Sequence, residues 1–308
     1  MARYVILRLL QGLVVIWIVT LMVFTILHLT PGDPVDLIIG EARTSPEQRE
    51  AIRHLWGLDR PIYTQYFIWL KNIIHGNFGE SIAFGGRPVT DLLRAAAPNT
   101  LKLNALALFF ALVVAIPAGI LAAVKRYTIF DASATVFSTL GISIPNFWLG
   151  LMLIILFSLK LGWLPPFGSN SWKAYILPVF VLSIEQMALL ARLMRATTLE
   201  VMGQEYVATA RAKGLTERVV MFRHIVRNSL LPIITVIGFR IGVLLSGTIV
   251  IETVFAWPGI GRLLFQAISR RDYLVVQSIV TIGAAIVILA TLVTDIIYAY
   301  VDPRIRYR

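Results

Sequence analysis

Long apolar runs separated by short polar segments dominate the pattern of this chain. A helix of about 20 apolar residues crosses a hydrocarbon core of about 30 Å, and six runs reach that length. The runs lie at Leu9–Leu29, Leu101–Val124, Ala132–Leu159, Tyr175–Leu193, Leu230–Ile251 and Leu274–Tyr300. The third and the sixth exceed a straight crossing, so we expect tilt, or a break at Pro145. The pattern predicts an all-α membrane protein with six transmembrane helices.

The first run is interpreted as a retained anchor covering residues 1–30. It follows Arg3 and Arg8, as the apolar core of a signal peptide would. However, it is about twice too long for such a core, and no small-residue cleavage site follows it.

The segment 31–98 is expected to be an extracytoplasmic loop with its own short helices. The stretch "SPEQREAIRHLWGL" opens with a Ser–Pro helix start and an acidic first turn. The stretch "YTQYFIWLKNIIHGNFG" has apolar residues at helical spacing and stops at Gly76. We therefore predict two or three short amphipathic helices, which either pack at the membrane edge or dock an external partner.

The basic residues predict the orientation of the chain. The protein has 308 residues, of which 57% are hydrophobic and 15% are charged, and its net charge is +11. This charge could suggest nucleic-acid binding, but the stronger interpretation is that cytoplasmic loops of membrane proteins collect Lys and Arg, so no nucleic-acid partner is expected. One set of short segments carries fourteen basic residues and the other set carries five. We therefore expect a multi-pass protein with both termini in the cytoplasm, including the tail 300–308.

Small residues recur at every fourth position in two of the runs. In lipid, such stripes let helix backbones approach closely. The stripe of the second run is interrupted by Pro117, which should kink that helix. This pattern suits a bundle that rocks between shapes, and it equally suits a static one. The stripes are Ala107, Ala111, Ala115, Gly119 and Ala123 in the second run, and Gly238, Gly242 and Ser246 in the fifth.

Two charged residues lie near the middle of predicted spans, Glu185 in the fourth and Arg240 in the fifth. A charge at that depth costs at least about 2.5 kcal/mol and should face a partner or a wet cavity. Our hypothesis is that both face the bundle interior at similar depth, either as a structural ion pair or as the lining of a substrate path. Glu252 and Asp295 lie nearer span ends, where long side chains reach water, and receive no role.

A charged stretch between the fourth and fifth spans predicts two short helices at a right angle. The first, "EYVATARAK", is dense in small residues and ends at Gly214, and Thr216 is a candidate N-cap for the second. We expect the alanines Ala208, Ala210 and Ala212 to be exposed on a knob shaped to enter a cleft on another protein. The alternative is an ordinary basic loop that touches anionic lipid.

Several of these stretches together resemble the permease subunits of binding-protein-dependent ABC importers. "EYVATARAKGL…RHIVRNSLLP" is similar to their cytoplasmic coupling loop, in the branch that transports dipeptides, oligopeptides, glutathione or nickel. The gap from Gly214 to Pro232 is longer than in the general form of that loop and similar to the peptide branch. "TPGDPV", "GNFGESI", "TVFAWPGIGRLL", "RRDYLVVQ" and "DPRIRYR" also resemble that branch, so the likeness covers nearly the whole chain.

The resemblance implies a type I importer permease fold, with the permease core at 96–299 and the coupling loop at 197–229. It implies that this loop docks on a separate ATPase and converts ATP-driven closure into reorientation of the bundle. Implied partners are a second similar permease, two ATPase chains that carry ATP and Mg, an extracytoplasmic solute-binding protein and membrane lipid, in a bacterial inner membrane. The coupling residues it implies are Glu205, Tyr206, Ala208, Thr209, Ala210, Arg211, Ala212, Lys213 and Gly214.

Two other classes of function compete with this interpretation. The chain contains no Gly-Lys pair and hence no phosphate-binding G-x-x-x-x-G-K-[ST] loop, so the energy comes from another subunit or from an ion gradient. An ion-gradient-driven transporter using Glu185 as a proton site is the first alternative. A membrane-embedded enzyme is the second, but no zinc pair, nucleophile elbow or cysteine is present, so we expect no catalytic or metal site. The cargo is not specified, and peptide is the preferred hypothesis.

Overall fold

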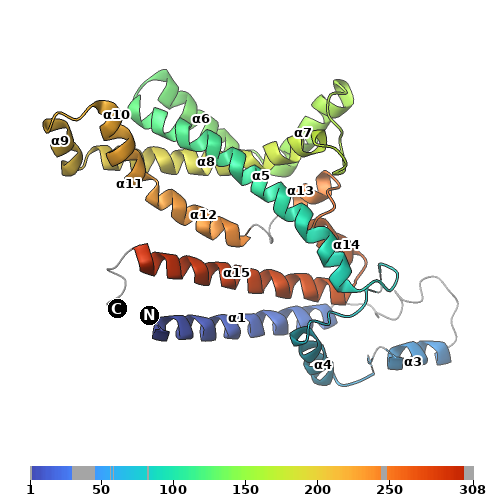
Figure 1. Ribbon diagram of the computed structural model, residues 1–308. Coiled ribbons are helices and arrows are strands. Elements are labelled where there is room, and N and C mark those ends of the chain that lie inside the picture. The colour runs from blue at the N-terminus through green and yellow to red at the C-terminus, as the bar shows by residue number, and fades with distance from the viewer. Residues whose placement is uncertain are drawn as a thin grey trace. The chain divides into compact units, whose positions relative to one another are not determined.

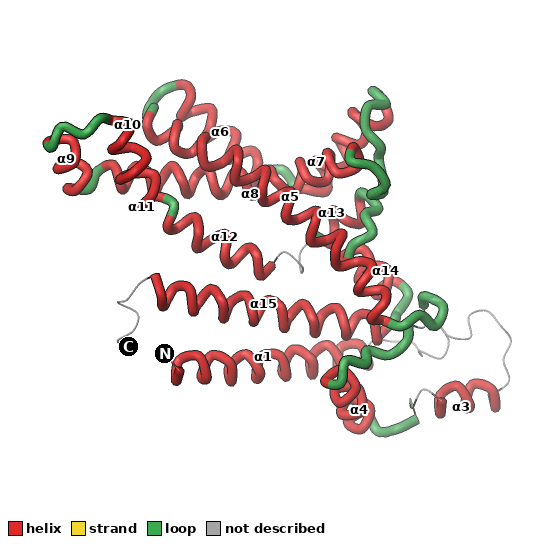
Figure 2. Tube along the Cα trace, in the orientation of Figure 1, coloured by secondary structure: helices red, strands yellow, loops and turns green. Residues whose placement is uncertain are grey.

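The computed structural model describes residues 2–29, 46–55, 57, 59–81, 83–243 and 248–301 (Figure 1). Within these residues the chain consists of helices and loops (Figure 2). Its β structure there is limited to one isolated bridge between Glu80 and Pro88. The chain divides into two compact units, each of which is described by itself. The first unit comprises 1–100, 245–249 and 258–308, and the second comprises 101–244 and 250–257.

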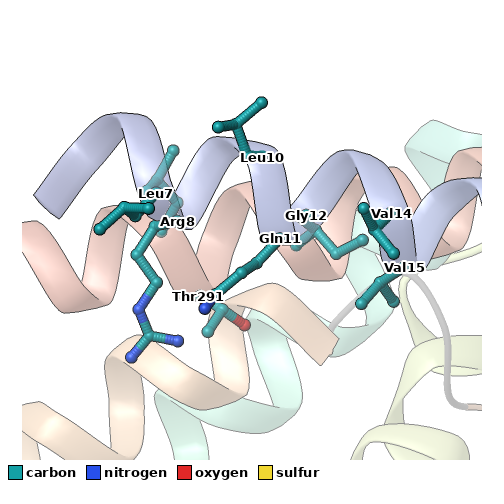
Figure 3. A pocket seen from close by; sticks show the side chains of 10 residues that line it. Leu7, Arg8, Leu10, Gln11, Gly12, Val14, Val15 and Thr291 are labelled. Atoms are coloured by element: carbon teal, nitrogen blue, oxygen red, sulfur yellow. The ribbon is translucent and has the colours of Figure 1, made fainter. Parts of the chain in front are cut away.

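The first unit is built on a pair of antiparallel helices, α1 (Ala2–Leu29) and α15 (Tyr273–Val301), which lie side by side (Figure 1). Gly12 permits this approach, because a Cβ at that position would lie 2.7 Å from Cγ2 of Ile288. A hollow of about 640 Å³ runs along the pair, with mainly apolar walls (Figure 3). Arg8, Gln11 and Thr291 are its polar side chains.

Two amphipathic helices follow α1, as the sequence predicts. They are α3 (Pro46–Leu55) and α4 (Ile62–Ile74). Helix α4 packs on the end of α1, where Tyr66 and Trp69 are buried against Phe24. Its C-terminal turn closes at Gly76, which has the positive φ that glycine adopts without strain.

The second unit contains the helices of the middle of the chain. Helix α5 (Val89–Val124) begins in the first unit and continues into the second, running through Pro117 without a break. After it come α6 (Ile129–Ser143), α7 (Asn146–Leu153), the π-helix η1 (Ile154–Lys160) and α8 (Lys173–Met202).

The predicted break at Pro145 is confirmed. The paired segments on either side of it, Ile129–Ser143 and Asn146–Lys160, are bent by 98°. Proline favours this position because it cannot donate the backbone hydrogen bond that a continuous helix needs. With this pair counted as one span, the described residues contain up to six candidate membrane spans, and five otherwise.

The remaining helices lie around the predicted fifth span. A candidate apolar stretch, Glu217–Gly238, overlaps the first part of that span and also includes the short helices that precede it. The second half of the predicted span, including Gly242 and Ser246, lies largely outside the described side chains. The elements here are α9 (Glu205–Ala212), α10 (Glu217–Val219), π-helix η2 (Val220–Val226), α11 (Arg227–Ser229), α12 (Leu231–Val243), α13 (Ile249–Val254) and α14 (Ile260–Ser269).

The small-residue stripe of α5 is a packing surface. Ala107, Ala111 and Ala115 are fully buried, and Ala123 is nearly so. At Gly119 an added Cβ would lie 2.6 Å from Cβ of Met194 and close to the backbone of α8. Because helices in lipid associate through such close contacts, the stripe holds α5 against α8.

We predict that Gly119→Ala lowers the stability of the protein by about 1–3 kcal/mol, because the added methyl group must push α5 away from the backbone of α8. The matched control is Gly283→Ala in α15, where no atom lies within 4 Å of the added Cβ. This control should be neutral or stabilising by up to about 1 kcal/mol. Thermal unfolding of both variants in the same detergent measures the difference, and equal melting temperatures would contradict the packing argument.

Candidate functional site

The candidate site is the compact element formed by α9, α10, η2 and α11, residues Glu205–Ser229, which we call the coupling elbow. Helix α9 ends in two backbone hydrogen bonds, from Gly214 N to Arg211 O (2.9 Å) and from Leu215 N to Ala210 O (3.4 Å). Gly214 has a φ of +77°, and no atom surrounds the position of a Cβ. The glycine is therefore required by the backbone of the turn, which is the Schellman helix ending.

The coupling elbow has its own hydrophobic core. Val207, Ala210, Val220 and Ile225 are buried together, with Met221 packed against them. Val207 and Ala210 are three residues apart and therefore share one face of α9. The expectation that all three alanines are exposed is wrong for Ala210, which helps to fix α9 against η2.

The outer surface of the coupling elbow carries the other proposed coupling residues. Arg211 forms an ion pair with Glu217, with Nε 2.8 Å from Oε1, and the Nδ2 of Asn228 donates to the Tyr206 hydroxyl at 3.0 Å. The aromatic side chain of Phe222, in η2, is 71% exposed. The exposed members of the predicted set are Glu205, Tyr206, Ala208, Thr209, Arg211, Ala212, Lys213 and Gly214.

Hydrogen bonds join the coupling elbow to α8. The Thr197 hydroxyl, 32 residues before Ser229, donates to the Ser229 carbonyl at 3.1 Å, and the Ser229 hydroxyl lies 3.5 Å from the Thr197 carbonyl. Ser229 is fully buried and Thr197 nearly so. Because buried polar groups are costly to separate from their partners, these bonds keep the end of the coupling elbow on α8.

An ion pair between a buried carboxylate and a partly exposed guanidinium joins α8 to α6. Arg195 donates from Nε to Oδ1 of Asp131 at 2.6 Å and from Nη2 to Oδ2 at 2.9 Å. The backbone N–H of Tyr127 adds a third bond to this carboxylate, at 3.0 Å. No pattern in the sequence points to this pair, since Asp131 and Arg195 lie beside predicted span ends and 64 residues apart. The bidentate geometry fixes the spacing and the orientation of the two helices.

Of the two proposed path residues, the structure describes the side chain of Glu185 but not that of Arg240. The Glu185 carboxylate accepts a hydrogen bond of 2.8 Å from Asn146, the first residue after the Pro145 break. Arg240 lies in α12, but its side chain is outside the described residues, as is that of Asp295, so an ion pair between Glu185 and Arg240 stays a prediction. The expectation that Glu252 reaches water is wrong, because its side chain is fully buried.

Two motifs of the sequence meet in the first unit. Asp272 of "RRDYLVVQ" is buried and accepts hydrogen bonds from the Ser81 hydroxyl and the Ala83 N–H, in the loop that follows "GNFGE". Asp272 Oδ1 also accepts from Val275 N at the start of α15, and Arg270 donates to the Ala83 carbonyl at 3.2 Å. The loop is thus held on the beginning of α15 by one carboxylate.

The family match agrees with this architecture. Residues 115–307, more than half of the chain, match the family described as the inner membrane component of binding-protein-dependent transport systems. The chain belongs to this family. Residues 1–91 match the corresponding N-terminal family. Membership makes the chain a multi-pass inner-membrane transport component, the permease subunit of an ABC importer.

Curated relatives cover the permease over its full length. It is 41% identical to the oligopeptide transport system permease protein AppB of Bacillus subtilis, with 100% of both chains covered. It is also 41% identical to the glutathione transport system permease protein GsiC of Escherichia coli K12, again with 100% of both covered. For the di/tripeptide transport system permease protein DppB of Pseudomonas aeruginosa the identity is 40%, and 94% of each is covered. These matches give no support to an ion-gradient-driven transporter.

Two solved structures share the fold. The MetNI methionine ABC transporter in an inward-facing conformation matches with a TM-score of 0.54 and 19% identity, over 69% of the permease and 97% of that chain. An amino acid ABC transporter solved with histidines gives a TM-score of 0.53 and 18% identity, over 68% of the permease and 94% of that chain. The fold is therefore that of type I ABC importer permeases.

We predict that Asp131→Asn lowers the melting temperature of the permease. The substitution leaves the Arg195 guanidinium without its carboxylate, and the Arg195 side chain is only 29% exposed. Thermal unfolding in detergent measures the loss. The double variant Asp131→Arg with Arg195→Asp restores opposite charges and should be more stable than the separate effects of Asp131→Arg and Arg195→Asp add up to. If the two separate effects simply add in the double variant, the pair contributes no mutual attraction.

Proposed function

We propose that this permease forms half of a translocation path for peptides or a similar small solute, and that separate ATPase subunits drive it by gripping the coupling elbow. The observation that carries the proposal is the construction of the elbow. It has its own buried core, a glycine-dependent turn at Gly214 and an exposed surface that includes Ala208 and Ala212. Such an element keeps its shape when a partner pushes on it.

The described contacts supply a route from the coupling elbow into the helix bundle. A displacement of the elbow reaches α8 through Thr197 and Ser229. Helix α8 passes it to α6 through Arg195 and Asp131, and to α5 through the close contact at Gly119. Each step is either a buried polar link or a backbone contact, so the helices are expected to move together rather than slide past one another.

The proposed assembly has the partners that such a mechanism needs. ATP and Mg belong to two ATPase subunits, because the sequence of the permease has no phosphate-binding loop. A second, homologous permease completes the path, and an extracytoplasmic solute-binding protein delivers the solute to the outer loops. In this arrangement the termini and the coupling elbow are cytoplasmic, in agreement with the excess of basic residues on that side.

Peptide is the proposed cargo. The relatives named above include oligopeptide, di/tripeptide and glutathione permeases, whose cargoes share peptide bonds and a charged amine and carboxylate. Within the permease, Glu185 provides a carboxylate held in place by Asn146 on the far side of the Pro145 break. A carboxylate in this position suits the amine end of a peptide.

We predict that Ala208→Asp prevents the ATPase subunits from co-purifying with the permease. Ala208 is exposed on α9, so the added charge meets the groove of a partner without disturbing the core of the coupling elbow. Affinity purification of the tagged permease from membranes, followed by quantification of the ATPase chains, measures the effect.

Two control variants separate docking from folding in this experiment. Ala196→Asp places the same charge on an exposed alanine of α8 outside the coupling elbow and should leave the ATPase chains bound. Ala210→Asp buries a charge in the core of the elbow and should lower the melting temperature as well. ATPase retention in folded Ala208→Asp, together with unimpaired import, would contradict the docking proposal.

The cargo is tested on the intact importer. We predict that the solute-binding subunit isolated with its permease retains short peptides, which mass spectrometry of the released ligand identifies. Radiolabelled peptide uptake by cells that lack other peptide importers provides the functional readout. Retention of a sugar or a metal chelate, with no peptide uptake, would overturn the peptide proposal while leaving the role of the coupling elbow intact.

A further inference from the structure

A small cleft of about 180 Å³ lies between α5, α6 and α8 in the second unit. Helix α5 contributes Gly119 and neighbouring alanines, α6 contributes three hydroxyl residues, and α8 contributes Arg192 and Arg195. The cleft is distinct from the proposed path residue Glu185, which does not line it. Its walls are therefore largely apolar, with polar groups supplied by two of the three helices.

The hydroxyl of Ser138 lines this cleft without a partner among the described residues. The side chains of Thr135 and Thr139, one turn apart on α6, donate to backbone carbonyls of their own helix at 2.9 Å. Ser138 forms no such bond, although the residue is only 8% exposed. Its hydroxyl is accessible from the cleft rather than sealed in the packing, so it is available to bond a polar group there.

The charges around the cleft favour an anion. Arg192 is exposed on the cleft and forms no ion pair within the described chain, while Arg195 is held against Asp131. Arg195 uses only Nε and Nη2 for that pair, so further donors of its guanidinium remain. Lys125 and Arg126 in the turn between α5 and α6 add two more positive charges near this end of the helices.

The position of the cleft favours a lipid over a dissolved anion. Arg192 is the penultimate residue of the apolar run that ends at Leu193, which is where a helix leaves the hydrocarbon for the headgroup layer. The hydroxyl residues and the alanines lie within the apolar runs. A molecule with an anionic phosphate next to an apolar chain matches this order of groups, and inorganic phosphate does not.

We propose that the cleft binds an anionic phospholipid of the cytoplasmic leaflet, with its phosphate on Arg192 and Arg195 and its glycerol region at Ser138. The assignment of the leaflet rests on the proposed function, which places the coupling elbow in the cytoplasm. Because the lipid touches α5, α6 and α8 at once, it stabilises the same three helices that Gly119 and Asp131 hold together. The bound lipid would then join the three helices through which the coupling elbow is proposed to act on the rest of the second unit.

The test measures lipid binding to the purified importer, assembled with its partner subunits in detergent. Phosphatidylglycerol or phosphatidylcholine with identical acyl chains is titrated in, and native mass spectrometry counts the lipids bound to the permease. Phosphatidylglycerol should bind more tightly, and Arg192→Gln should weaken its binding about tenfold, since one charge-assisted contact is lost. Arg87→Gln, which removes an exposed charge in the outer loop, is the matched control and should change nothing.

Three outcomes overturn the proposal. The first is equal phosphatidylglycerol binding by the wild type and by folded Arg192→Gln, and the second is equal affinity for the two lipids. The third is full competition by millimolar inorganic phosphate, which would make the cleft a site for a free anion. Ser138→Ala serves as a second variant, expected to weaken binding less than Arg192→Gln. The amount of ATPase subunits in the same preparation is measured separately. If these subunits are missing, the proposed function is contradicted, but the lipids bound to the permease can still be counted and the lipid proposal is still tested.

Discussion

Helices in a bilayer gain no hydrophobic energy from contact with one another, because lipid is as apolar as their side chains. The second unit is therefore held together by close backbone contacts and a few buried polar links, and most of these involve α8. Gly119 brings α5 against α8, and Gly141 of α6 lies so close that an added Cβ would be 3.1 Å from Ile184. The ion pair between Asp131 and Arg195 also fixes the orientation of α6 relative to α8. Helix α8 thus acts as the common support of the unit.

The coupling elbow depends on the same support. Its buried residues come from α9 and η2, so the fold of the elbow does not require a partner, but its attachment runs through Thr197 and Ser229 at the end of α8. The core of the elbow and its attachment to α8 are thus formed by different residues. In the proposed mechanism, a partner that presses on the exposed Ala208 or Ala212 displaces the elbow as one folded element, and the load passes to α8 through Thr197 and Ser229.

Local patterns in the sequence predicted much of this architecture. The apolar runs located the long helices, Pro145 marked the break, and Gly214 marked the end of α9, since each feature depends on its own segment. Contacts between distant segments were not accessible. Asp131 and Arg195 are 64 residues apart, and Ser81 and Asp272 are 191 apart, so no periodicity connects them. Ala210 was misplaced because alanine fits both a buried and an exposed face, and only its partners Val220 and Ile225 decide between them.

One continuous helix, α8, carries both the attachment of the coupling elbow and the proposed path residue Glu185. Glu185 and Thr197 are twelve residues apart on this uninterrupted helix, or about 18 Å, and no proline lies between them. The proline of α8 is Pro178, on the other side of Glu185, where the missing backbone hydrogen bond makes a bend easier. The segment between Thr197 and Glu185 therefore has no proline to weaken it, and the position where α8 bends most easily lies beyond Glu185. The Pro145 break lies at the same level, because Asn146 bonds to Glu185. In the proposed mechanism, this segment of α8 connects movement of the coupling elbow to the carboxylate that is proposed to meet the cargo.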